Sequence, residues 1–247
     1  MSVILQIKNL VKSFPEPDGG VVEILDVPSF SMEEGEQVAL IGQSGGGKTT
    51  LLHLIAGLLS ADVNPFMTDN DENDDDDDAT AKKTSIIIGN IELTNLSEEG
   101  RDRFRAHMIG YVFQTFNLLP AFTALENVRL GMTFGSGKAP NSRAMDLLDR
   151  VGLADRADYR PSQLSVGQQQ RVAIARAMAG QPRLLLADEP TANVDPQSAE
   201  MVLDLIRKTC SEENVALLMV THDMQIASRF DRIERLDQIN RAIHSKI

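Results

Sequence analysis

This sequence is poor in several features that would each point to a particular class of protein. Cysteine occurs once, at Cys210, which excludes a disulfide within the chain and favours a reducing compartment. No apolar run approaches the roughly 20 residues that a membrane-spanning helix needs. The N-terminal apolar stretch is expected to be too short for a secretory signal, and no small-residue cleavage site follows it. Any membrane role is therefore expected to depend on a partner protein.

The chain also lacks the basic excess typical of nucleic-acid-binding proteins. Its formal net charge is −12, and nine of its acidic residues lie between positions 61 and 81, where there is no Lys or Arg. Without those nine negative charges, −12 becomes −3, an ordinary balance for a soluble protein. We therefore expect no nucleic-acid partner. The stretch 61–83, rich in Asp and Asn, is expected to be a disordered, solvated insertion.

A calcium site is the alternative for that acidic stretch. Asp69, Asp71 and Asn73 have the spacing with which an EF-hand loop begins. The loop then requires a glycine and later a closing glutamate, where this sequence has Asp74 and Thr80. The match fails at both positions, so the solvated insertion is the preferred interpretation.

A glycine-rich loop with one lysine lies between a predicted strand and a predicted helix. The apolar strand Gln37–Ile41 precedes the pattern Gly-x4-Gly-Lys-Thr, and the helix predicted over 50–59 has its leucines on one face. In such a loop the backbone N–H groups and the positive end of the helix face phosphate oxygens. The residues assigned to nucleotide binding are Gly42, Gln43, Ser44, Gly45, Gly46, Gly47, Lys48, Thr49 and Thr50. Lys48 is expected to reach the terminal phosphates and Thr49 to ligate Mg²⁺; a plain turn is the alternative.

Two adjacent carboxylates follow a second apolar strand, predicted over 183–187. Asp188 is expected to hold Mg²⁺, directly or through water, and Glu189 to polarise an attacking water. The alternative is a strand end capped by two solvated acids. Because a phosphate loop precedes them in the chain, we prefer the functional interpretation.

The order of predicted elements indicates the class of fold. Two strands over 3–11 and 21–30 are joined by a turn at 15–20, and strands then alternate with helices along much of the chain. Alternation of this kind predicts a parallel sheet with crossover helices. Short strands are expected near the end, over 233–236 and 239–244.

One further motif resembles a known family. Leu164-Ser-Val-Gly-Gln168, at the start of a predicted helix, closely resembles the Leu-Ser-Gly-Gly-Gln signature of ATP-binding-cassette (ABC) ATPases. Other motifs of the family follow in register over nearly the whole chain. Gln114 matches its Q-loop glutamine, Thr191–Asp195 its D-loop, and His222 its switch histidine. Phe14 stands where the family stacks an aromatic ring on adenine, with a core aromatic as the alternative.

The resemblance implies an α/β fold. It consists of a P-loop ABC ATPase core, with a mostly parallel sheet and flanking helices, an antiparallel β subdomain and an inserted α-helical subdomain. Residues 1–247 are expected to form a single ABC ATPase domain. Within it, 1–114 and 181–247 would form the catalytic core with the β subdomain, and 115–180 the helical signature subdomain.

The resemblance also implies an enzyme that hydrolyses ATP with Mg²⁺ and that one chain cannot complete. In the family, two copies face head to tail, and each ATP lies between one phosphate loop and the partner's signature. The residues that would contact nucleotide from the signature and the D-loop are Ser165, Gly167, Gln168 and Asp195. Their placement at a helix N-terminus suits phosphate binding.

The catalytic roles implied by the resemblance fall on three residues. Glu189 would be the general base, and His222 would hold the γ-phosphate and the water. Gln114 would join the metal and the water to the helical subdomain. Asp195 would couple the two sites across the interface of the dimer.

The signature departs from the family pattern at Val166. A β-branched residue does not readily take a positive φ, so a position that needs glycine would be disturbed here. The retained Ser165, Gly167 and Gln168 predict activity, at an altered rate. Ala192, where relatives often have Gly, is a milder departure.

Two segments resemble one branch of the family, the ATPases of lipoprotein release, macrolide export and related efflux. They are Tyr111–Pro120 and the D-loop. The resemblance implies a separate transmembrane permease, a place in the cytoplasm on the inner face of the membrane, and a dock formed by Phe116, Leu118, Leu119 and Phe122. The alternative is a cell-division-like cassette that regulates envelope enzymes through a permease-like partner. A DNA-maintenance cassette is disfavoured, because no long coiled coil or basic face is present.

Overall fold

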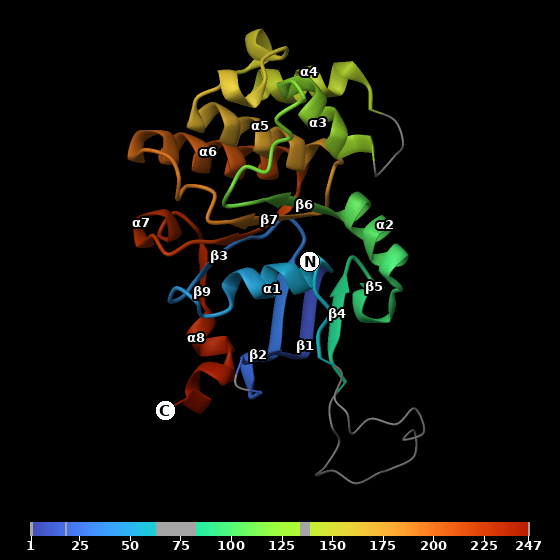
Figure 1. Cartoon of the computed structure of the whole chain (residues 1–247), viewed down its shortest axis with the longest axis vertical. Coiled ribbons are helices and arrows are strands. Elements are labelled where there is room, and N and C mark those ends of the chain that lie inside the picture. The colour runs from blue at the N-terminus through green and yellow to red at the C-terminus, as the bar shows by residue number, and fades with distance from the viewer. Residues whose placement is uncertain (1, 18, 63–82, 134–138, 247) are drawn as a thin grey trace.

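The computed structural model describes residues 2–17, 19–62, 83–133 and 139–246. Two sheets form its framework (Figure 1). The antiparallel sheet has the strand order β2-β1-β4-β5, and the parallel sheet has the order β6-β7-β8-β3-β9. The strands are β1 (Val3–Pro15), β2 (Val21–Glu33), β3 (Gln37–Ile41), β4 (Ser85–Ile88), β5 (Ile91–Glu92), β6 (Ile109–Val112), β7 (Leu184–Asp188), β8 (Ala216–Val220) and β9 (Arg232–Arg235). The expected parallel and antiparallel sheets are both confirmed.

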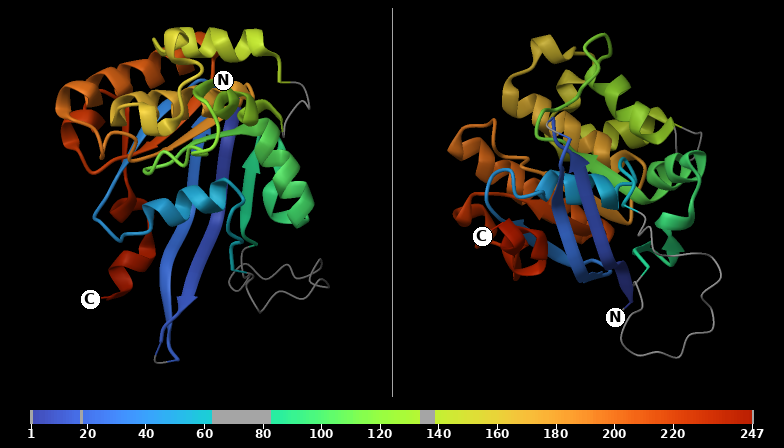
Figure 2. Two further views of the ribbon diagram at one scale, coloured as in Figure 1. Left: turned by 45° about the horizontal axis from the view of Figure 1, so that its top comes forward. Right: turned by 60° about the horizontal axis from the view of Figure 1, so that its bottom comes forward.

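Helices cover both faces of the parallel sheet, as the turned views in Figure 2 show. Helix α1 lies between the two sheets, and the helices on the other face include α5 and α6 (Figure 1). The α-helices are α1 (Lys48–Ile55), α2 (Glu98–Met108), α3 (Ala124–Thr133), α4 (Asn141–Arg150), α5 (Val166–Ala179), α6 (Pro196–Glu213), α7 (Met224–Ala227) and α8 (Leu236–Ile239). Among the described residues, no helix is both long and apolar enough to cross a membrane.

The parallel sheet is buried on both faces at its centre, because β8 is apolar at every position and β3 and β7 are apolar except for Gln37 and Asp188. In β7, Leu184 and Leu186 face the core shared with α1 and the antiparallel sheet, whereas Leu185 and Ala187 face the core beneath α3 to α6. Such continuous apolar runs are typical of a parallel strand covered on two sides. The carboxyl ends of these strands therefore meet at one edge, where polar side chains reach solvent.

The long hairpin of β1 and β2 carries both ends of the acidic stretch. Asp62 accepts hydrogen bonds from Nζ of Lys12 at 2.6 Å and from the backbone N–H of Ser13 at 2.5 Å. At the other end, the Thr84 hydroxyl donates to the carbonyl oxygen of Asn9 at 2.7 Å. Both ends are thus attached to one part of β1. Residues 63–82, which hold most of the expected insertion and the calcium alternative, lie outside the described residues.

The strand expected over 239–244 is wrong. Residues Arg241–Lys246 form a 3₁₀ helix that follows α8. The reason is the buried Asn240, whose side chain accepts from the N–H of Asp26 at 2.7 Å and donates to the carbonyl of Ile24 at 2.8 Å. The Asn240 side chain thus makes two hydrogen bonds to β2 of the kind that the backbone of a further strand would make. The backbone after Asn240 is therefore not held in an extended conformation and forms the 3₁₀ helix.

Candidate functional site

The loop between β3 and α1 is shaped by glycine and folded around its own lysine. Gly47 has φ of 94°, and a Cβ there would come within 2.9 Å of the Ile24 side chain, so only glycine fits. Nζ of the buried Lys48 donates to the carbonyl oxygens of Gly42 at 2.9 Å and Gln43 at 2.8 Å. The lysine is therefore held within the loop, beside the positive end of α1.

The carboxyl end of β7 lies against the first turn of α1. The Thr49 hydroxyl donates to Oδ2 of Asp188 at 2.9 Å. Burial raises the pKa of Asp188, and this hydrogen bond opposes the rise. The neighbouring Glu189 charge raises the pKa further, whereas His53 and Lys48 lower it. A hydroxyl and a carboxylate oxygen thus converge beside the loop, and both are ligands that Mg²⁺ prefers.

Glu189 occupies a strained backbone position and contacts the predicted switch histidine. Its φ is 45°, in the left-handed region that non-glycine residues seldom adopt. Its backbone N–H donates to the carbonyl of Val220 at 3.0 Å, which attaches it to the end of β8. Nδ1 of His222 lies 2.9 Å from Oε2 of Glu189. The histidine side chain is 63% exposed and that of the glutamate 18%, so the carboxylate is shielded and the ring faces the solvent side.

Gln114 follows β6 and is attached to the D-loop. Its backbone carbonyl accepts a hydrogen bond from Nδ2 of Asn193 at 2.8 Å. The next residues of the same segment are held from α5, because the guanidinium of Arg176 donates to the carbonyls of Phe116 at 2.8 Å and Asn117 at 2.6 Å. Burial lowers the pKa of Arg176. Gln114 thus lies at the point where the D-loop and the helical region meet.

The predicted signature residues stand at the beginning of α5 and bond to one another. The Ser165 side chain accepts from the N–H of Gln168 at 3.3 Å, and the Gln168 side chain accepts from the N–H of Ser165 at 2.9 Å. This reciprocal pair is a capping box. Val166 is the first residue of the helix, with a right-handed backbone, so the expected conflict with a positive φ does not arise in this conformation.

The remaining predicted site residues are Asp195, Phe14 and Gly167. Asp195 caps α6 by accepting from the N–H of Ser198 at 3.0 Å, and hydrogen bonds from the Ser198 side chain and then from its N–H lower the pKa of the Asp195 carboxyl. Phe14, near the end of β1, is half-buried with the Lys12 ammonium 5.3 Å from its ring centre. A Cβ on Gly167 would lie 3.5 Å from the Ser198 hydroxyl, which places the signature beside α6.

The structure therefore brings one group of the predicted site residues together, and the signature residues make their hydrogen bonds apart from that group. The united residues come from three segments and form one cluster: Lys48, Thr49, Asp188, Glu189 and His222. The hydrogen bonds of the Ser165 and Gln168 side chains instead close on each other, at the start of α5. Within the ranges described, no group of three or more His, Cys, Asp and Glu side chains is arranged to hold a metal ion.

Two residues near the cluster were not assigned from the sequence. Tyr111 on β6 stacks on Phe113 at 4.2 Å and lies 5.9 Å from the His53 ring. Burial raises the pKa of its hydroxyl, and the Asp188 charge adds to the rise. Asn193 lies within the D-loop motif, but nothing in the motif singles out its amide. Its partner, the Gln114 carbonyl, lies 79 positions away in the sequence.

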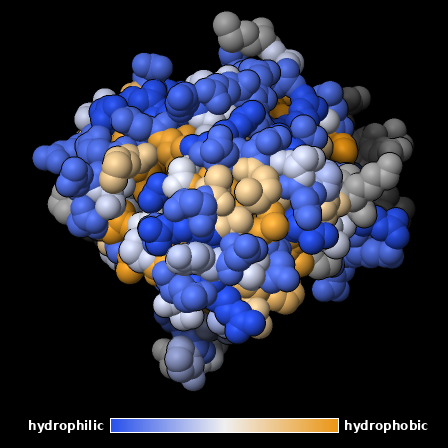
Figure 3. Space-filling view, turned by 90° about the horizontal axis from the view of Figure 1, so that it is seen from above, coloured by the Kyte–Doolittle hydropathy of each residue, from blue (hydrophilic) through white to orange (hydrophobic). Residues whose placement is uncertain are grey.

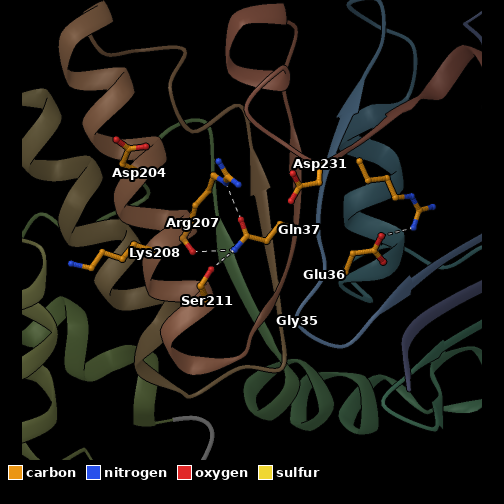
Figure 4. A pocket seen from close by; sticks show the side chains of 9 residues that line it. Gly35, Glu36, Gln37, Asp204, Arg207, Lys208, Ser211 and Asp231 are labelled. Atoms are coloured by element: carbon orange, nitrogen blue, oxygen red, sulfur yellow. Dashed lines mark hydrogen bonds and ion pairs between the residues drawn. The ribbon is translucent and has the colours of Figure 1, made fainter. Parts of the chain in front are cut away.

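Two cavities are candidates for the nucleotide site. One of about 200 Å³ lies beside the phosphate loop and is bounded by the segment from Leu236 to Ile243. A larger one of about 650 Å³ lies where β3 begins, between α6 and β9 (Figure 4). Its polar groups pair with one another: Gln37 with Arg207 and Ser211, and Glu36 with Arg232. The smaller cavity is therefore the one that belongs to the predicted nucleotide site.

Known proteins resemble this chain over most of its length. A sequence profile of the ABC transporter family matches residues 25–192. The lipoprotein-releasing system ATP-binding protein LolD of Pseudomonas syringae pv. tomato is 40% identical over 236 residues, and the match covers 95% of each protein. Two solved dimeric structures of the ATP-binding cassette MJ0796 are similar, each at 33% identity with a TM-score of 0.78, covering 94% of this chain and 93% of that one. One of them is a post-hydrolysis state bound to ADP and Pi.

Proposed function

The chain belongs to the ABC transporter family, as an ATP-binding cassette that hydrolyses ATP, and we propose that two copies of it drive a separate permease of an export-type system. One observation supports the catalytic assignment most directly. The Thr49–Asp188 hydrogen bond and the Glu189–His222 contact lie beside one phosphate loop, which supports a metal-binding role for the first pair and a base role for Glu189. The similarity to a lipoprotein-releasing ATPase supports the export-type assignment.

The oxygen ligands at the loop fit Mg²⁺. Thr49 and Asp188 would hold the ion together with the phosphates, and the Gln114 side chain would complete the set from the β6 side. Two protein oxygens already lie 2.9 Å apart, which suits an ion that takes further ligands from phosphate and water. When bound, Mg²⁺ would neutralise charge on the phosphates.

Glu189 is the proposed general base. Its carboxylate takes the proton of the attacking water, and the contact with His222 orients that carboxylate. Lys48 leaves the two loop carbonyls and bonds the terminal phosphates instead, because their charge outweighs that of neutral carbonyl oxygens. The strained φ of Glu189 fixes the direction in which its side chain leaves the strand.

The second half of each site is proposed to come from the other copy. The N-terminus of α5 presents Ser165 and backbone N–H groups, which suit a phosphate. The two MJ0796 cassettes are described as dimeric, which supports the same assembly here. Loss of the γ-phosphate after hydrolysis then removes the group that both copies bind, and the dimer opens.

A permease would dock on the helical region. Leu119, Phe122 and Tyr159 are exposed there, and the carbonyl of Tyr159 accepts from the N–H of Ala124 at 2.8 Å, so the segments that carry them are adjacent. Figure 3 looks down on this side and shows apolar atoms in the middle of a largely polar face. The proposal places the protein in the cytoplasm at the inner face of the membrane.

The proposal is tested by the rate of phosphate release from ATP over a wide range of protein concentration. We expect activity per chain to rise with concentration until dimers saturate, and to stop when EDTA removes Mg²⁺. Activity per chain that stays constant on dilution would contradict the shared site. Co-purification with a membrane protein from the same cells tests the permease, and Phe122→Asp should weaken it.

A further inference from the structure

Beyond the pairing of β6 with β7, a side-chain hydrogen bond joins the segments that carry two of the proposed catalytic residues. Asn193 follows Glu189 by four residues, in a tight turn where the N–H of Ala192 donates to the Glu189 carbonyl at 3.1 Å. From this turn, Nδ2 of Asn193 donates to the backbone carbonyl of Gln114 at 2.8 Å. The carbonyl can only accept, so the amide must present its NH2 group.

Gln114 has little else to fix its position. The pairing of β6 with β7 ends at Val112, and β6 is one of the two edge strands of the parallel sheet. Gln114 lies two residues beyond that last pair. The next attachments of the chain are the bonds from Arg176 to Phe116 and Asn117. Among the described hydrogen bonds between the end of β6 and Phe116, the one from the Asn193 side chain is therefore the contact that fixes the backbone position of Gln114.

We propose that Asn193 is a positioning residue, which holds Gln114 at a fixed place relative to Glu189 so that the two act on the same water. The proposal rests on the proposed roles of Gln114 and Glu189. A side chain that sets the place of a reacting group changes the rate of the chemical step more than the affinity for substrate. Through Asn193, the D-loop thus positions a residue of its own chain's site, in addition to any contact with a second copy.

The experiment is a double-mutant cycle with Asn193→Ala, Gln114→Ala and both together. We expect Asn193→Ala to lower kcat about tenfold with little change in KM for ATP, since misplacement by an ångström costs up to about a hundredfold. In the Gln114→Ala background the same change should lower kcat by less than about twofold, because its effect is transmitted through Gln114. The melting temperature, measured for all four proteins, should be unchanged by Asn193→Ala.

Two further variants separate positioning from packing. Asn193→Asp keeps the shape but removes the donor, so it should behave like Asn193→Ala. Asn193→His can place a ring N–H where the amide N–H lies, so it should restore most of kcat.

The proposal is overturned if Asn193→Ala leaves kcat unchanged, or if it lowers kcat by the same factor with and without Gln114. It is equally overturned if the melting temperature falls in step with activity. An unmodified protein that releases no phosphate from ATP would instead contradict the proposed function. A protein that hydrolyses ATP and loses activity in Gln114→Ala, but not in Asn193→Ala, contradicts the positioning role alone.

Discussion

The phosphate-loop half of the site and the signature half are built in different ways. In the first, hydrogen bonds and close contacts join side chains from three separate segments, Thr49 to Asp188 and Glu189 to His222. In the second, Ser165 and Gln168 bond only within the first turn of α5. One half is held together by tertiary structure, and the other is a capped helix end that is stable without further partners.

This difference indicates which part of the reaction each half can perform alone. The phosphate-loop half holds Lys48, Thr49, Asp188 and Glu189 close together, so on the proposed roles we expect it to bind nucleotide as a single copy. The helix end of α5 offers N–H groups and a hydroxyl that would contact the nucleotide of a second copy. In the proposed dimer, hydrolysis would then depend on two copies meeting, and its rate would depend on whatever brings them together.

The largest effect is expected from Glu189→Gln in the first half. The amide has the same size but cannot take a proton, so turnover should fall by about 10²- to 10⁴-fold. ATP binding should persist, because no bond from Glu189 holds the loop, and the closed dimer should accumulate. Phosphate release and the molecular mass in solution with ATP measure the two outcomes.

A matched change elsewhere on the surface controls for the loss of one negative charge. Glu200 on α6 forms an exposed ion pair with Arg229 at 2.5 Å, so Glu200→Gln should cost less than about 1 kcal/mol of stability and leave turnover unchanged. Normal turnover in Glu189→Gln would refute its role as the base.

A smaller effect is expected from Ser165→Ala in the second half, and the chain contains its own control. Ser97 caps α2 as Ser165 caps α5, accepting from the N–H of Gly100 at 3.2 Å. Replacing either serine by alanine should cost about 1 kcal/mol of stability. Only Ser165→Ala should also lower kcat/KM, by about tenfold, because a hydrogen bond to a charged phosphate contributes about 1.5–3 kcal/mol.

Thermal unfolding and steady-state kinetics of both serine variants test this comparison. Equal falls in melting temperature with unequal activity support the phosphate contact. If both variants keep full activity, the signature half does not contribute this hydroxyl to the nucleotide.

The first half of the site was predictable because its chemistry is local in the sequence. A glycine with φ of 94° and a lysine beside it must be adjacent in the chain, and so must the acids that end β7. The parallel sheet was predictable from the alternation of strands and helices, whereas the antiparallel subdomain was implied by the family resemblance. The strand order β6-β7-β8-β3-β9 was not predictable, because it depends on pairing between distant segments.

Side chains that bond a distant backbone were missed or misread. Asn240 bonds Ile24 and Asp26 on β2, more than two hundred positions away, and its effect was to turn an expected strand into a 3₁₀ helix. Asn193 bonds Gln114 in the same manner. An asparagine has no periodic signature, so its partner becomes visible only when the fold is known.

The smallest effect is expected from Val166→Gly, which restores the residue that the family has at this position. Val166 is 47% exposed and has the right-handed backbone of a helix, so the change relieves no strain. Glycine is less favourable in a helix by up to about 1 kcal/mol, which should lower the melting temperature by a few degrees at most. ATP hydrolysis should stay within about twofold of the unmodified protein, because Ser165 and Gln168 keep their bonds. A gain of tenfold or more would mean that the valine side chain obstructs the second copy, and that the closed dimer needs a conformation at this position that the single chain does not adopt.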